Sequence, residues 1–181
     1  VDLFVFTLGF TEAWCLNEDG TMFPVAPGTI AGSYDPEKYS FKNLRYPEIY
    51  AELQEFYDCL KAVNPTARIL LTVSPVPMTA TATDKHILVA TTYSKSVLRS
   101  VAGDLSEDSD DIYYFPGYEI VGTHPSRAMY YETNLRNVNP YGVDYVMSHF
   151  VSGRIAKELN AEIKSDDEDL ELICEEEKLG L

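Results

Sequence analysis

Two short apolar runs constrain what this chain can fold into more than any other feature of its sequence. Residues 2–8 (DLFVFTL) and 68–74 (RILLTVS) are almost entirely apolar or β-favouring and show little alternation of polar and apolar positions. Runs of this kind are typical of strands that are buried on both faces, as in parallel sheets. Gly9 ends the first run, and Pro75 closes the second. We therefore predict two central strands of a parallel sheet.

Apolar residues at helical spacing follow each of these predicted strands. The spacing predicts helices over residues 47–63, 85–103 and 140–159, and a short third strand over residues 112–115. A strand, a helix and a strand in this order favour a right-handed crossover. The expected fold class is therefore α/β, with a doubly wound parallel sheet between two layers of helices.

Two segments lack sustained periodicity and are predicted to be loops. Residues 15–46 are rich in Gly, Pro, Asn and Tyr, and loops of this length usually act as lids or binding elements. Residues 124–139 form a second, polar segment. Because both follow predicted strands, we expect them at the edge of the sheet where the strands end, which is where α/β sheets bind ligands.

Composition and charge exclude several classes of function. The chain has 181 residues, of which 45% are apolar, which is enough for one domain with a core. A formal net charge of −15 argues against a nucleic-acid partner, and no apolar run approaches the roughly 20 residues of a membrane-spanning helix. The three cysteines form no CxxC pair, so we expect no disulfide, no metal site, no cofactor and a cytoplasmic location.

The C-terminal end carries much of the acidity. We divide the chain into a domain over residues 1–160 and an acidic tail over residues 161–181. The simpler interpretation of the tail is a solvated segment, and the alternative is a short partner-docking helix near residues 170–174. In that alternative the chain acts as a scaffold through its tail.

Two polar clusters follow predicted strands and could carry chemistry. In the first, Gly9, Thr11 and Glu12 can present a hydroxyl donor and a charge to a pocket, although Thr11 could equally cap a helical turn that starts at Glu12. The second cluster runs over residues 134–142 (NLRNVNPYG). Its simplest interpretation is a turn in which Asn139 caps a helix with proline at the first position.

Taken together, these blocks resemble the GSCFA domain family of the SGNH (GDSL-like) hydrolase superfamily. The resemblance spans most of the chain from Val1 to about Phe150 and is carried by the blocks DLFVFTLGFTEAW, LLTVSPVPMTAT, TTYSKSVLR, YFPGYEI and NVNPYGVDYVMSHF. It implies a three-layer, flavodoxin-like sheet. The nucleophilic serine of such hydrolases lies in a Gly-Ser-Cys-Phe-Ala motif, which this sequence lacks. We therefore expect that the chain is truncated, and that the first strands and this serine lie upstream of Val1.

The resemblance also implies roles for residues in both clusters. Thr11 stands at the position of the oxyanion-hole Asn of SGNH enzymes. Asn134 and Asn137 stand where those enzymes have the Asp and the His of the catalytic triad. An amide has no proton affinity near neutral pH and cannot serve as a general base. Either catalysis has been lost, or another residue is the base.

The chain has three histidines that could serve instead. His124 follows the third predicted strand, and His86 opens a helix whose positive end disfavours the protonated imidazole. His149 lies within a helix, where a surface or packing role is the better interpretation. Ser94 and Lys95 are adjacent on a predicted helix, so we interpret them as part of an exposed face rather than as a nucleophile pair.

The leading functional prediction is an ester hydrolase, either an esterase or a carbohydrate deacetylase. Its substrate would be a small-molecule or carbohydrate ester, attacked by the upstream serine, with Gly9 and Thr11 near the oxyanion and His124 or His86 as the base. The alternative is a catalytically inactive module that keeps the fold and binds a carbohydrate or another ligand.

Overall fold

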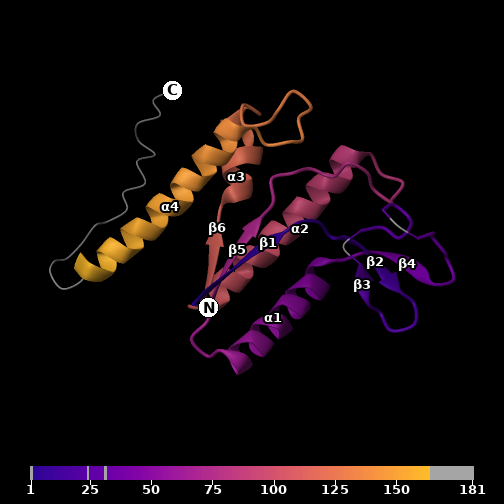
Figure 1. Ribbon diagram of the computed structural model, residues 1–181, viewed down its shortest axis with the longest axis horizontal. Helices are drawn as coiled ribbons and strands as arrows, with labels where there is room; N and C mark the ends of the chain where they lie inside the picture. Colours follow the sequence, from indigo (N-terminus) through magenta and orange to yellow (C-terminus); the bar gives the residue numbers. More distant parts are fainter. Residues whose placement is uncertain (1, 24, 31, 164–181) are drawn as a thin grey trace. The chain divides into compact units, whose positions relative to one another are not determined.

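The computed structural model describes residues 2–23, 25–30 and 32–163 (Figure 1). The chain divides into two compact units, Val1–Val146 and Met147–Leu181. The first unit holds both sheets and every predicted site residue. Of the predicted acidic tail, residues 164–181 lie outside the described residues.

A three-stranded parallel sheet forms the centre of the first unit. Its strands, in spatial order, are β1 (Leu3–Leu8), β5 (Arg68–Val73) and β6 (Ile112–Phe115). Leu8 lies opposite Val73, and Ile69 lies opposite Ile112. The sheet is flanked by helices, so the predicted parallel sheet and mixed α/β class are confirmed.

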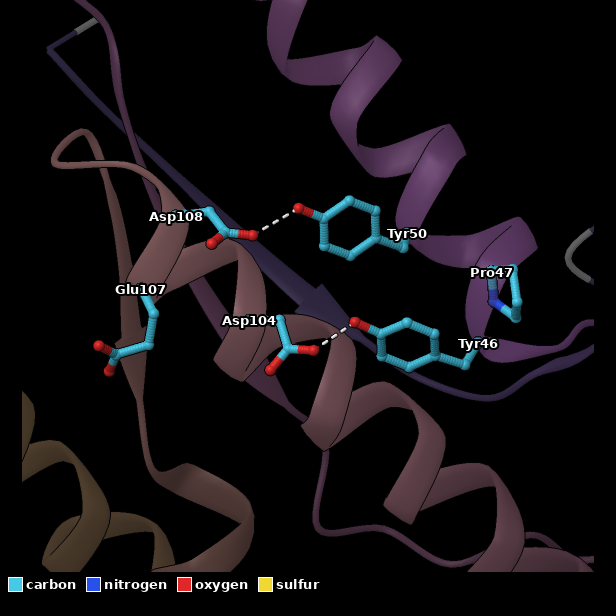
Figure 2. A pocket seen from close by; sticks show the side chains of 6 residues that line it. All are labelled: Tyr46, Pro47, Tyr50, Asp104, Glu107 and Asp108. Carbon is cyan, nitrogen blue, oxygen red and sulfur yellow. Dashed lines mark hydrogen bonds between the residues drawn. The ribbon is translucent and has the colours of Figure 1, made fainter.

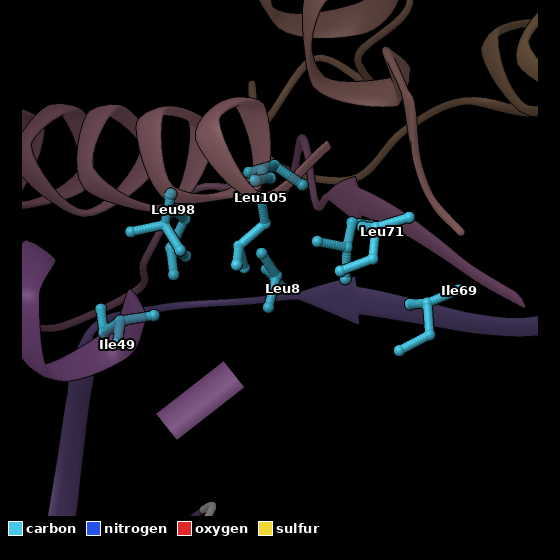
Figure 3. Packing of buried hydrophobic residues seen from close by; sticks show 10 residues of the cluster. Leu8, Ile49, Ile69, Leu71, Leu98 and Leu105 are labelled. Carbon is cyan, nitrogen blue, oxygen red and sulfur yellow. The ribbon is translucent and has the colours of Figure 1, made fainter. Parts of the chain in front are cut away.

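The core fills the space between this sheet and two helices, α1 (Tyr46–Val63) and α2 (Ile87–Asp108). Figure 3 shows Leu98 and Leu105 of α2 reaching toward Leu8 and Leu71 of the strands. Burial of each such side chain stabilises the fold by roughly 1.5 to 3 kcal/mol. The apolar runs and the helical stripes of the sequence therefore meet in one core.

Local sequence signals explain where α1 begins and ends. The backbone N–H of Arg45 donates to the carboxylate of Glu48 (2.9 Å), and Pro47 lies in the first turn. At the other end, the Asn64 N–H donates to the Leu60 carbonyl (2.8 Å), and a proline follows. The helix matches the predicted one almost residue for residue.

Helix α2 is longer than predicted, because Gly103 does not end it. A glycine within a helix is unfavourable by about 1 kcal/mol relative to alanine. Here Val101, Ala102 and Leu105 are all at most 1% exposed, so packing on both sides of the glycine outweighs its low propensity. The helix continues to Asp108, and β6 follows after a three-residue connection.

The predicted loop over residues 15–46 is irregular over most of its described length, but short parts of it pair with residues 12–16 in a second, antiparallel sheet that was not predicted. The Trp14 ring lies 5.5 Å from Phe41 on the paired strand and 5.2 Å from Tyr34. Cross-strand aromatic contacts of this kind stabilise a sheet too small to have its own core. The strands, in spatial order, are β3 (Met22–Phe23), β2 (Glu12–Leu16) and β4 (Tyr39–Asn43).

The C-terminal part of the fold is mostly as predicted. Helix α4 (Pro140–Ile163) begins at the predicted proline and continues past residue 160. Residues 124–139 are irregular apart from a 3-10 turn, η1 (His124–Ser126), and a short helix that was not predicted, α3 (Gly117–Gly122), precedes them. Among the described residues, no helix combines the length and the apolar character that crossing a bilayer requires.

Candidate functional site

The turn over residues 9–12 leaves the carboxyl end of β1 and passes directly into the second sheet. Thr11 is completely buried (0% exposed). Its hydroxyl donates to Asn43 Oδ1 (2.7 Å), and its backbone N–H donates to Ser94 Oγ (2.8 Å). Thr11 is not a helix cap, because Glu12 begins a strand rather than a helical turn. Contacts from two different elements therefore hold the turn in one conformation.

Lys95 lies beneath the same turn. Its ammonium donates to the Gly9 carbonyl (2.8 Å) and lies 4.2 Å from the centre of the Phe10 ring. Burial lowers the pKa of Lys95 to about 8, because the charged form is poorly solvated there. No carboxylate of the described residues forms an ion pair with it. A buried ammonium thus supports the turn that follows β1.

The predicted exposed helix face at Ser94 and Lys95 is wrong, since these side chains are 0% and 1% exposed. Adjacent helical residues point about 100° apart, and α2 has neighbours over a wider arc than that. One neighbour is the sheet, and the other is the turn after β1. The burial of Ser94 could have been predicted from its spacing, because it lies four residues from both Ala90 and Leu98 on the buried face of α2.

Glu12 ties this turn to the loop that follows β5. Its carboxylate accepts a hydrogen bond from the Thr81 hydroxyl and another from the Ala82 backbone N–H (3.1 Å). The contacts join residues about 70 positions apart in the sequence. In the described residues Glu12 acts as an anchor between the segments that leave the ends of two neighbouring strands.

His86 is the N-cap of α2. Its Nδ1 accepts a hydrogen bond from the Leu88 backbone N–H (3.2 Å), and the side chain is otherwise exposed. A neutral imidazole that accepts at Nδ1 carries its proton on Nε2. The nitrogen that could take up a proton is therefore already engaged in the cap.

His124 is exposed at the start of η1, and no contact joins it to the turn over residues 9–12 within the described chain. The segment that carries it leads on to Tyr131, whose hydroxyl donates to the Pro75 carbonyl (2.7 Å). This bond attaches the 124–139 segment to the loop after β5. The structure thus brings the predicted loop over residues 124–139 to the end of β5 but does not place either imidazole against Thr11.

The amides of the second cluster shape the backbone. Asn134 Oδ1 accepts hydrogen bonds from the backbone N–H groups of Arg136 (2.9 Å) and Asn137 (3.0 Å). Asn139 Oδ1 accepts from the Gly142 N–H (2.7 Å), which confirms the predicted cap of α4. The Asn137 side chain is exposed. Asn134 and Asn139 thus hold the backbone of this segment, and the amides of Asn134 and Asn137 cannot act as general bases.

Gly142 completes this arrangement because its backbone packs against Tyr130. A Cβ at Gly142 would lie 2.8 Å from the Tyr130 Cβ, closer than side chains approach. Tyr130 is itself buried, and its ring stacks on Tyr145 with the ring centres 5.0 Å apart. The glycine of the NPYG run is therefore required by packing.

A cavity of about 460 Å³ lies elsewhere, between the first turns of α1 and the last turns of α2. In Figure 2 the rings of Tyr46 and Tyr50 point toward Asp104 and Asp108, and each hydroxyl donates to the carboxylate opposite it. The hydrogen bond to Asp104 raises the pKa of Tyr46 to about 12. None of the predicted site residues lines this cavity. It was not foreseen from the sequence.

A smaller cavity of about 210 Å³ lies on the second sheet and has an apolar lining that includes Phe23, Ile30 and Tyr39. Within the described residues, no group of three or more His, Cys, Asp or Glu side chains is arranged to hold a metal ion. The polar chemistry at the strand ends thus comes from hydroxyls, amides, a carboxylate and one buried lysine.

Comparison with known proteins agrees with the blocks quoted above. Neither a curated protein nor a solved structure matches the chain. The family model described as "GSCFA family" matches residues 1–150, which include both sheets, the turn after β1 and the amide cluster before α4. This chain belongs to the GSCFA family.

Proposed function

We propose that this GSCFA domain is an SGNH-type ester hydrolase, built on the three-layer, doubly wound sheet of that superfamily. One observation carries the proposal. The turn over residues 9–12 is anchored by the buried Thr11, is fixed by hydrogen bonds from two elements and lies over the Lys95 ammonium, at the carboxyl end of a central parallel strand. Ligands of open α/β sheets bind at such strand ends. A rigid, electropositive turn there suits the negative charge that develops on an acyl oxygen.

In the proposed reaction, a serine upstream of Val1 gives its hydroxyl proton to a base, which later returns it to the leaving alcohol, and the serine oxygen attacks the acyl carbon. The carbonyl π electrons move to the oxygen, and the resulting oxyanion is stabilised at the turn over residues 9–12. When the oxyanion collapses, the alcohol leaves with a proton, and an acyl-serine remains. Water then adds to the acyl-serine and releases the carboxylic acid and the free serine.

His124 is the better candidate for the base in this scheme. It is exposed, and no hydrogen bond from the described residues engages its ring. His86, in contrast, uses Nδ1 to cap α2. The Thr11 hydroxyl already donates its hydrogen bond to Asn43 Oδ1, so we assign the oxyanion to the turn as a whole rather than to this hydroxyl.

The proposed substrates are small-molecule or carbohydrate esters, and the proposed location is the cytoplasm. The net charge of −15 disfavours a polyanionic partner. The experiment is to assay the full-length protein on 4-nitrophenyl acetate and acetylated xylan, and to treat it with a fluorophosphonate that labels active serines. We expect acyl release and one labelled serine, in the segment before Val1. Absence of both would refute the hydrolase.

A ligand-binding module without catalysis is the second candidate, and the cavity between α1 and α2 favours it. Tyrosine rings offer a stacking surface for a sugar, and carboxylates accept hydrogen bonds from its hydroxyls. This candidate predicts saturable binding of an oligosaccharide that is lost in Tyr50→Ala and is unaffected by His124→Ala together with His86→Ala. Isothermal titration calorimetry on the three proteins separates it from the hydrolase.

A further inference from the structure

The Gly9–Phe10 peptide is held by the ammonium of Lys95. The ammonium donates to the Gly9 carbonyl at 2.8 Å, and the Phe10 ring covers it at 4.2 Å. No other described residue accepts a hydrogen bond from this ammonium in the structure. The lysine chain is 1% exposed and comes from the middle of α2, a rigid element. The orientation of this one peptide is therefore fixed by a hydrogen bond from the α2 side.

The direction of the carbonyl also fixes the direction of the N–H in the same peptide. A trans peptide is planar, and its C=O and N–H point to opposite sides. The chain has no cis peptide among the described residues. Because the Gly9 carbonyl points at Lys95, the Phe10 N–H points away from α2. Within the described chain, no acceptor pairs with that N–H, and Phe10 is 42% exposed.

We propose that the Phe10 backbone N–H is an oxyanion donor of this domain and that Lys95 is the residue that positions and polarises it. The inference rests on the proposed ester hydrolysis and names two residues for it. A cation at the carbonyl end of a peptide draws electrons from the amide and strengthens its N–H as a donor. The N–H then meets the oxygen on which negative charge develops.

This arrangement explains why the lysine is buried at a place where no carboxylate of the described residues pairs with it. A buried ammonium is unfavourable unless it is paired, and replacement by an apolar side chain is often tolerated or stabilising. The groups that face Lys95 are the Gly9 carbonyl and the Phe10 ring from the turn, and burial is what lowers its pKa to about 8. The ammonium form therefore predominates at neutral pH and is lost above it.

The first test reads the Phe10 amide directly by NMR, in the full-length protein labelled with [15N]phenylalanine. We expect its proton and nitrogen shifts to titrate as the pH rises through about 8. The titration should disappear in Lys95→Met and persist in Lys85→Met. Lys85 is a matched control, because it also lies over an aromatic ring, that of Tyr93, but is exposed. A Phe10 amide that does not respond in the wild-type protein would overturn the inference.

The second test separates positioning from folding by kinetics on 4-nitrophenyl acetate. Lys95→Met should lower kcat at least tenfold with KM within about twofold, whereas Lys85→Met should leave both unchanged. Lys95→Gln keeps a neutral donor to the Gly9 carbonyl and should recover part of kcat. Thermal unfolding of each variant shows that the protein is folded. A kcat within twofold of wild type in Lys95→Met would overturn the inference.

The two tests also distinguish this inference from the proposed function. If the wild-type protein has no ester activity, the hydrolase proposal fails, and with it the oxyanion role. The control of the Phe10 N–H by Lys95 is then decided by the NMR titration alone. If the protein is active and Lys95→Met is as active as the wild type, the hydrolase proposal stands and this inference is wrong.

Discussion

The ammonium of Lys95 makes the stability of this fold depend on pH in a way that ordinary surface lysines do not. Its pKa in the folded protein is lowered to about 8 from 10.5, because burial disfavours the charged form. Below pH 8 the lysine is protonated in both the folded and the unfolded chain. Between pH 8 and 10.5 the unfolded chain binds more protons. Stability from this group therefore rises with pH across that window.

Comparison of the wild-type protein with Lys95→Met isolates this contribution. The difference in free energy of unfolding, wild type minus variant, should increase by on the order of 1 to 2 kcal/mol from pH 8 to 10.5, after allowance for solvent screening. Urea unfolding at a series of pH values measures it, and Lys85→Met provides the baseline. A difference that stays constant or falls across this range would contradict the buried-ammonium account.

The two candidate histidines should respond differently to substitution. His86→Gln removes the Nδ1 acceptor at the start of α2, so we expect a loss of about 1 kcal/mol of stability and little change in kcat. His124→Gln should leave stability within about 0.5 kcal/mol and lower kcat by 10²-fold or more. Steady-state kinetics and urea unfolding of both variants show which histidine affects kcat and which affects stability. Loss of activity in His86→Gln alone would reverse the assignment.

Predictions from the sequence were least accurate for the burial and the contacts of single residues. Lys95 is charged, and long charged side chains are rarely buried unless paired, so the exposed face was the reasonable prediction. Its burial depends on a turn more than 80 positions earlier in the chain, and no local pattern contains that information. Asn139 was predictable, because a cap and its proline are adjacent in sequence.

At the scale of elements, the side chain of Asn139 both caps α4 and binds the segment that precedes this helix. Asn139 Oδ1 caps the helix at Gly142, and its Nδ2 donates to the carbonyls of Met129 (2.9 Å) and Tyr131 (3.2 Å). Asn139→Ala should lower the free energy of unfolding by roughly 1 to 3 kcal/mol, because a cap and two carbonyl partners are lost.

Asn139→Asp is the informative companion to that change. It keeps the capping oxygen but cannot donate, so its loss of stability should lie between those of the wild type and the alanine variant. Asn137→Ala, at an exposed side chain of the same segment, should change stability by less than about 0.5 kcal/mol. Urea denaturation of the three variants gives the order. An aspartate variant as unstable as the alanine variant would assign the whole effect to the donor bonds.

Elements were predictable where local and tertiary signals agree. The strands β1, β5 and β6 and the helix α1 have apolar patterns and end signals in their own sequence, and the same apolar residues pack in the core. The second sheet was missed because its strands are only two to five residues long and are separated by segments that contain Gly and Pro. Its pairing relies on contacts of Trp14 with Phe41 and Tyr34, which are 20 or more positions away.

At the scale of the whole chain, β1 has only β5 as a neighbour among the described strands. Val5 and Phe6 on this strand are 50% and 37% exposed. An outer strand with exposed apolar side chains is a template for pairing with another chain. We therefore expect the 181-residue chain to self-associate through β1, as measured by size-exclusion chromatography with light scattering.

Val5→Lys should reduce the associated fraction, because a lysine on an outer strand opposes edge-to-edge pairing. Val63→Lys is the control, since Val63 is 86% exposed at the end of α1 and does not belong to the strand. A chain that remains monomeric at all concentrations, or an equal response to both substitutions, would show that the β1 edge does not drive association.

The segment that forms the second sheet begins and ends at neighbouring positions beside β1. The backbone N–H of Leu44, where the insertion ends, donates to the carbonyl of Thr11, where it begins (2.9 Å). A segment whose two ends are hydrogen-bonded to each other can be lengthened, shortened or replaced while the flanking parts of the chain keep their structure. Apart from Glu12 and Asn43, which contact Thr81 and Thr11, the segment between these residues can therefore vary and present a different recognition surface while the parallel sheet is unchanged.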